Sequence, residues 1–168
     1  NSRLYGDFDY TRMSTDAFIN FLPHKKSPVV IFGRIKSIIM LGDNPPSQDM
    51  PAITNDTPFY LAGNNILGSD EVIHLRGWND WRLGDRLIYG TIESRVGTPQ
   101  LSLTAFLDFG NAWYAVQTPD DWIFTCGYEL RVNIGFIVLA YGTAQDFNRW
   151  RDGENPNNYL RMTLVNPF

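Results

Sequence analysis

The chain has 168 residues, of which 43% are hydrophobic and 19% charged, and its mean hydropathy is −0.24. The formal net charge of −4, with the 14 basic residues scattered along the sequence, argues against nucleic acid as a partner. The single cysteine excludes an intrachain disulfide, and no apolar run approaches the ~18 to 20 residues of a membrane-spanning helix.

Period-two alternation of apolar and polar residues predicts seven β-strands, whereas helix signals are scarce. In chain order, the predicted strands lie within 7–22 and at 29–41, 86–96, 101–113, 124–134, 136–145 and 159–168. Many of them reach about ten residues, which is longer than the ~5 to 6 of an average soluble strand and suits the ~9 to 11 of a membrane strand. The predicted fold class is therefore all-β.

The connections between these strands alternate between short and long. The short ones are 23–28, 97–100 and 133–135, and the long ones are 42–84, 114–123 and 146–158. Outer-membrane barrels alternate short periplasmic turns with long extracellular loops. We therefore expect an antiparallel transmembrane β-barrel in the bacterial outer membrane, with its C-terminus at the periplasmic side. A soluble β-sandwich or lipocalin-like barrel is the alternative, but it explains neither strand length nor loop alternation.

Three features of the sequence carry a family resemblance. They are Leu75-Arg76-Gly77-Trp78 in the longest connection, Phe106-Leu107-Asp108-Phe109-Gly110 two strands later, and an alternating last strand that runs from Tyr159 to the terminal aromatic Phe168. Together they resemble the BamA/TamA-type superfamily of outer-membrane assembly and translocation barrels, also called the bacterial surface antigen family. The resemblance implies that 1–168 is the C-terminal part, seven or so strands, of a barrel of about sixteen strands.

In that family, an Arg-Gly loop tip folds back into the lumen, where its arginine meets the F-x-D-x-G motif of a strand. The resemblance implies that 42–84 is an extracellular loop that folds back into the lumen in the same way. Phe106, Asp108 and Gly110 share the polar face of their strand, which must face the lumen because a carboxylate aimed at lipid is costly. We expect Asp108 to accept a charge-assisted hydrogen bond from Arg76. The glycine of the tip allows a tight turn, and its tryptophan offers a flat apolar surface.

Glu93 is a second acidic candidate, because family members often add such a contact from the preceding strand. If the turn before the next strand has two residues, Glu93 lies opposite Thr104 and ~13 Å along the strand from Asp108. One arginine would not readily hold both carboxylates. Glu93 is thus the weaker candidate, with Arg95 or Arg34 as its alternative partners.

The sequence contains no Gly-x-Ser-x-Gly elbow and no phosphate-cradling glycine loop. The function is therefore inferred from the family resemblance. We expect no enzyme activity, no cofactor and no metal. The resemblance implies a protein that assists insertion of outer-membrane proteins or translocates polypeptides. The implied partners are outer-membrane lipid and lipopolysaccharide, the remaining barrel strands from upstream sequence or another chain, client polypeptides, and accessory periplasmic or lipoprotein subunits. The alternatives are a membrane anchor or exporter for an N-terminal effector domain, patatin-like or a propeller, and a passive pore.

Overall fold

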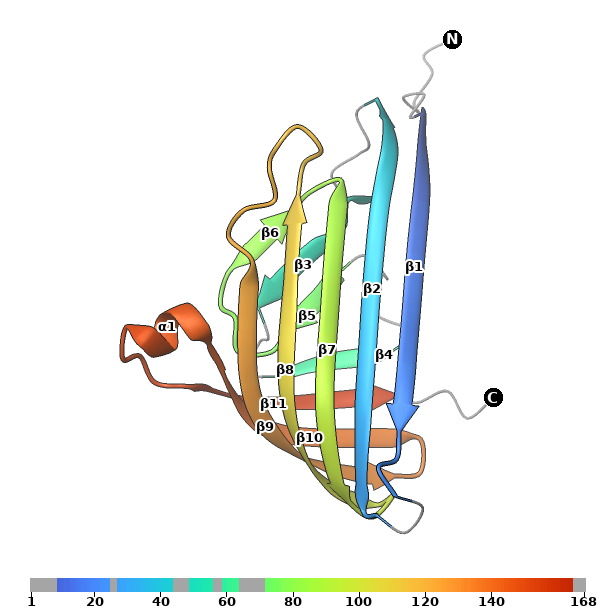
Figure 1. Ribbon diagram of the computed structural model, residues 1–168, viewed down its shortest axis with the longest axis vertical. Coiled ribbons are helices and arrows are strands. Elements are labelled where there is room, and N and C mark those ends of the chain that lie inside the picture. Colours follow the sequence, from blue (N-terminus) through green and yellow to red (C-terminus); the bar gives the residue numbers. More distant parts are fainter. Residues whose placement is uncertain (1–8, 25–26, 44–48, 56–58, 64–71, 165–168) are drawn as a thin grey trace.

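The computed structural model describes residues 9–24, 27–43, 49–55, 59–63 and 72–164. Seven long strands in these ranges form one antiparallel sheet in the order β1-β2-β7-β8-β9-β10-β11 (Figure 1). Their bounds are β1 Asp9–Phe21, β2 Val29–Asp43, β7 Arg86–Gly97, β8 Leu101–Trp113, β9 Ile123–Ile134, β10 Ile137–Asp146 and β11 Asn157–Leu164. The seven strands predicted from alternation are confirmed. Alternation predicts strands because side chains of successive strand residues point to opposite faces.

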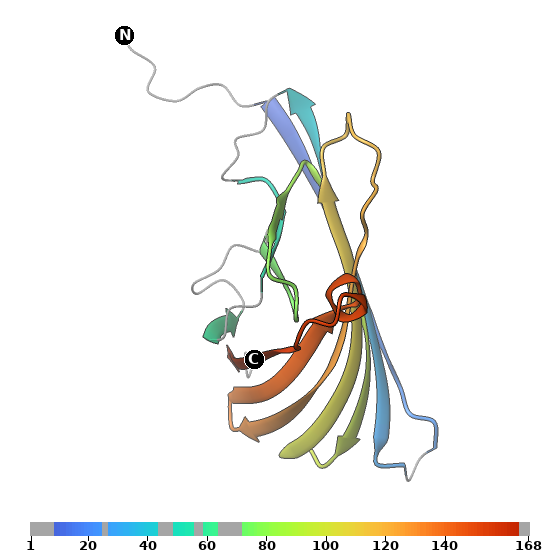
Figure 2. The same ribbon diagram turned by 90° about the vertical axis from the view of Figure 1, so that its left-hand side faces the viewer.

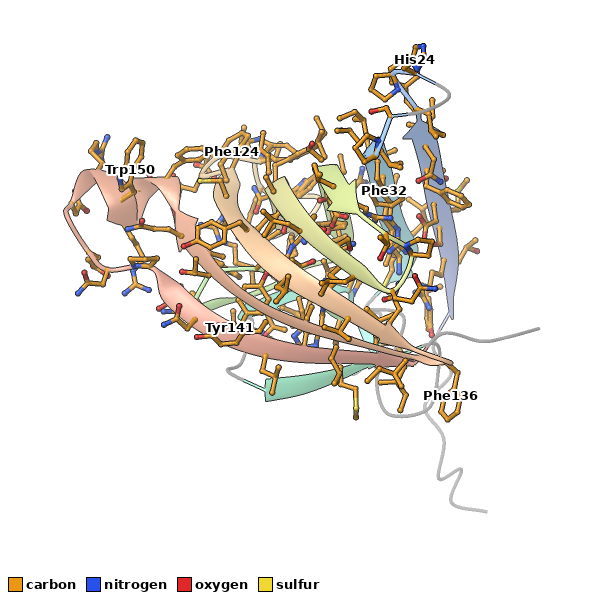
Figure 3. All side chains as sticks on the ribbon, turned by 90° about the horizontal axis from the view of Figure 1, so that it is seen from below. His24, Phe32, Phe124, Phe136, Tyr141 and Trp150 are labelled. Carbon is orange, nitrogen blue, oxygen red and sulfur yellow. The ribbon has the colours of Figure 1, made fainter. Side chains whose placement is uncertain are left out.

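The sheet is strongly curved (Figures 2 and 3), and its two faces differ in chemistry. On β8, Leu103 is 53% exposed on the convex face, whereas Asp108 on the concave face is fully buried. Figure 3 shows the labelled Phe124 and Tyr141 on the outside of the curve. The distribution is the reverse of an ordinary soluble sheet, since the polar face is the covered one.

Within the described ranges the sheet stays open. One edge is β1, and the other is β4 (Phe59–Gly63), which pairs in parallel with β11. All other neighbours in this sheet pair antiparallel. The fold shown is thus an open, curved, all-β sheet.

The connection between β2 and β7 carries structure that the sequence did not predict. Besides β4, it forms a three-stranded sheet on the concave side of the large one (Figure 2). The strands of this small sheet are β3 Ala52–Asn55, β5 Val72–Leu75 and β6 Trp81–Leu83, with β3 in the centre. Three or four residues are too few for a period to be detected, so these strands depend on tertiary packing.

An apolar core joins the small sheet to the large one. Ile53 and Leu75 from the small sheet are fully buried, and Trp78 is nearly so. The large sheet contributes concave-face residues to the same cluster, namely Ile38, Leu87, Ala112 and Ile123. This core holds residues 72–83 against the middle of the large sheet.

The connection between β10 and β11 contains the short helix α1, Phe147–Arg151. Its N-cap is Asp146, whose side chain accepts a hydrogen bond from the backbone N–H of Asn148. In the described part of the chain, no helix has the length and apolarity needed to cross a membrane.

Gly110 should control how closely the two sheets approach. A Cβ atom at this position would lie 2.8 Å from Cδ1 of Ile53. We expect Gly110→Val to lower the free energy of unfolding by ~1 to 3 kcal/mol through overpacking and to expose residues 72–83 to protease. Chemical unfolding and limited proteolysis of the full-length protein measure both effects. The control is Ala105→Val, on the convex face of the same strand; equal protease resistance of the two variants would contradict the packing role.

Candidate functional site

The tip of the connection places Arg76 directly after β5, where it is 2% exposed. The tight turn predicted at Gly77 is present, with a φ of +81°. A Cβ atom there would lie 2.7 Å from the backbone of Ala144, so both conformation and space require glycine. Trp78 packs in the apolar core beside Leu75. The side chain of Arg76 is thereby directed onto the concave face of β7, β8 and β9.

The Arg76 guanidinium makes five hydrogen bonds, which equals its number of N–H groups. Nε and Nη2 donate to the two carboxylate oxygens of Asp108 at 2.7 and 2.5 Å. Nη2 also donates to Thr91 Oγ1 at 2.9 Å. Nη1 donates to Glu93 Oε1 at 2.9 Å and to Glu129 Oε1 at 3.3 Å. The structure therefore brings Arg76 and Asp108 together in the bidentate geometry expected of a guanidinium and a carboxylate.

The expectation that one arginine would not hold both Glu93 and Asp108 is wrong, because the assumed strand register is wrong. Gly97 pairs with Ser102, so the turn is longer than the two residues assumed, and Glu93 lies opposite Phe106. Glu93 is then only two positions from Asp108 along the strand. At ~3.4 Å per residue, one guanidinium spans the two carboxylates.

Glu93 is 4% exposed and links three guanidinium groups. Besides Arg76, it accepts from Arg95 at 2.7 Å and from Arg131 at 2.8 Å. Arg34, the other partner considered for it, pairs instead with a carboxylate of β1. Glu93 thus belongs to the same cluster as Asp108.

Glu129 is a member of the cluster that the sequence did not single out. It is fully buried and accepts from Arg161 at 2.7 Å and from the hydroxyl of Tyr159 at 2.8 Å, and it also pairs with Arg131. Its position on the polar face of its predicted strand was the one available signal. Tyr159, expected only as part of a C-terminal signature, is 2% exposed and ties β11 to the cluster. Phe168, the other signature residue, lies outside the described residues.

The three residues of the F-x-D-x-G motif have three separate roles. Asp108 binds Arg76, as described above. The Phe106 ring centroid lies 3.6 Å from the guanidinium carbon of Arg76, which is a cation–π contact. Gly110 leaves room for Ile53 of the small sheet, because a Cβ atom at Gly110 would lie 2.8 Å from Cδ1 of Ile53. The motif is therefore a complementary surface for the loop tip.

Electrostatically, the cluster consists of four guanidinium groups (Arg76, Arg95, Arg131 and Arg161) and three carboxylates (Glu93, Asp108 and Glu129). Burial works against the charged form of Arg76, but the surrounding groups, Asp108 foremost and Glu129 among them, together hold the pKa of the guanidinium well above its usual value. Each carboxylate receives guanidinium donors. The arrangement acts as an ionic cross-link between the loop tip and four strands. In the described ranges, no group of His, Cys, Asp and Glu side chains could hold a metal ion.

No model of a known protein family matches the chain, and no curated protein matches it. The family resemblance stays a prediction from the sequence motifs.

Removing one partner of the buried Arg76–Asp108 pair should be costly. We expect Arg76→Met to lower the free energy of unfolding by ~3 to 5 kcal/mol, because the Asp108 carboxylate stays buried without a guanidinium partner. Asp108→Asn should cost less, because Arg76 keeps Glu93 and Glu129 as acceptors. The exposed pair of Arg34 and Asp16 gives the control, since Arg34→Gln should cost ~0 to 1 kcal/mol. Chemical unfolding of the full-length protein, with circular dichroism to check strand content, makes the measurement. Equal stability of all three variants would refute the cross-link.

Proposed function

We propose that the chain is the C-terminal part of a transmembrane β-barrel in the bacterial outer membrane, belonging to the BamA/TamA-type superfamily, and that it assists insertion of outer-membrane proteins or translocation of polypeptides. The contact that carries the proposal is the one between Arg76 and the F-x-D-x-G motif. The rest of the support comes from the convex face, the sheet edges and the small sheet.

The convex face supports a lipid environment. Large apolar side chains on all seven long strands are exposed there, among them Met13, Ile19, Ile35, Ile92, Leu103, Leu130, Tyr141 and Leu160. An apolar patch of this extent marks an interaction surface, in contrast to isolated surface leucines. From Phe124 to Ile134, β9 spans ~34 Å along the strand, or ~25 Å of height at the usual tilt of 35–45°. That height equals the apolar band of an outer-membrane barrel.

The edge of β1 supports the presence of further strands. In the described residues, β1 has a neighbour on one side alone, which leaves a row of backbone N–H and C=O groups. Such groups cannot remain unpaired in hydrocarbon, so a membrane barrel requires more strands beside β1. Upstream sequence or another chain would supply them.

The small sheet supports a role other than passive diffusion. β3, β5 and β6 lie on the concave side, which is the lumen of the proposed barrel (Figure 2). The Arg76 cluster holds this segment by buried ionic contacts. A pore needs an aqueous path, whereas a barrel that assembles or translocates polypeptides can use such a segment as an internal strut.

A charge on the convex face tests the membrane location. We expect Leu103→Arg to destabilise the inserted protein by ~2 to 4 kcal/mol, because the guanidinium would face lipid. Val116→Arg is the control, since Val116 is 95% exposed in the connection between β8 and β9. Cell fractionation should show less Leu103→Arg protein in the outer membrane than parent or control. Recovery of the parent in the soluble fraction would favour the soluble sandwich.

Depletion of the protein tests its activity. In the cell that makes it, we expect the amounts of other outer-membrane barrels, or of a translocated polypeptide, to fall when the full-length protein is removed. Re-expression of the parent should restore them, and Asp108→Asn should restore them only in part, because the strut is weakened. Unchanged amounts after depletion would favour an anchor for an effector domain.

A further inference from the structure

A cavity of about 410 Å³ lies on the concave face, at the end of the sheet where the short turns are. Its walls come from the turn between β1 and β2, the turn between β7 and β8, and the adjoining parts of β9 and β10. The polar residues that line it are Ser27, Arg95, Thr98, Ser102, Arg131 and Asn133. Among the described residues, no carboxylate lines the cavity.

Two guanidinium groups converge at this cavity because both bind the same carboxylate. Nε and Nη2 of Arg95 lie 2.7 Å from Oε2 of Glu93, and Nη2 of Arg131 lies 2.8 Å from Oε1. The Arg95 guanidinium also lies over the ring of Phe32, 4.2 Å from its centroid. These contacts fix the planes of both guanidinium groups.

Each of the two arginines keeps donors for a ligand. Nη1 of Arg95 and Nη1 of Arg131 have no acceptor within the described part of the chain, and their side chains are 31% and 12% exposed. Ser102 lies directly opposite Arg131 in the pairing of β8 with β9. Three donors from three adjacent strands therefore border one cavity.

The charge of the surroundings favours an anion. Arg95 and Arg131, which line the cavity, are positively charged, and none of the described lining residues is negatively charged. Glu93 faces the two arginines from behind and holds them in place. An anion entering from the cavity would meet their unpaired N–H groups without meeting a carboxylate.

We propose that this cavity binds a phosphate group, either as free phosphate or as a phosphate ester. A tetrahedral oxyanion presents several oxygens in different directions, which suits donors from Arg95, Ser102 and Arg131 better than a planar carboxylate does. The cavity is within the ~300 to 1,000 Å³ of small-molecule sites, so it has room for the organic part of an ester. The site does not depend on the membrane location proposed above.

The test uses the full-length purified protein in detergent and follows binding by calorimetry. The probes are inorganic phosphate, glucose 1-phosphate, acetate, and a short-chain phosphatidic acid in mixed micelles. We expect at least one phosphate probe to bind and acetate to bind at least about tenfold more weakly. Arg95→Gln and Ser102→Ala should each weaken phosphate binding, Arg95→Gln by about tenfold or more, and added salt should weaken it further.

The matched control is Arg34→Gln, which removes a concave-face arginine that does not line this cavity and should leave binding unchanged. Circular dichroism and thermal unfolding check that each variant is folded. Binding of glucose 1-phosphate or inorganic phosphate identifies a soluble ligand, whereas binding of phosphatidic acid alone identifies a lipid headgroup; each supports the site. Absence of phosphate binding, equal binding of acetate, or full binding by a folded Arg95→Gln variant would overturn the proposal.

Discussion

The guanidinium of Arg76 has to be paired where it is buried, and much of the described structure is arranged to do this. A guanidinium removed from water loses several kcal/mol of hydration, which is recovered only with well-placed acceptors. Its five N–H groups find theirs on β7, β8 and β9. These hydrogen bonds fix the position of the loop tip relative to the three strands. Through Glu129, the same cluster reaches Tyr159 on β11 and so extends across the sheet.

Small residues make this arrangement geometrically possible. Gly77 brings the tip against the backbone of β10, and Gly110 admits the small sheet. Gly127 contributes in the same way, because a Cβ atom there would lie 2.8 Å from the ring of Phe106. That ring supports the guanidinium from one side. Apolar packing and ionic pairing therefore occur at the same place. Both depend on glycines, because the absence of a side chain lets neighbouring groups approach the backbone closely.

The two faces of the sheet connect the site to the proposed function. In a water-soluble sheet the apolar face is covered, whereas here the convex apolar face is exposed and the polar concave face is filled. A lipid exterior and an occupied lumen account for both observations in the proposed barrel. The proposed phosphate site follows from the same arrangement, since Glu93 binds the arginine of the strut on one side and orients Arg95 and Arg131 toward the cavity on the other.

The sequence by itself determined the long strands, their faces and the two motifs that supply Arg76 and Asp108. Alternation is a local property, so it predicted β9 and β8 almost to the residue, and it placed Asp108 on the polar face. Tertiary structure decided what depends on register and on distant chain segments. The turn after β7 set Glu93 beside Asp108, which a two-residue turn could not do. Packing on the large sheet created β3, β5 and β6, and strand pairing brought Glu129 to Arg76 across 53 positions of sequence, a distance over which no local pattern carries information.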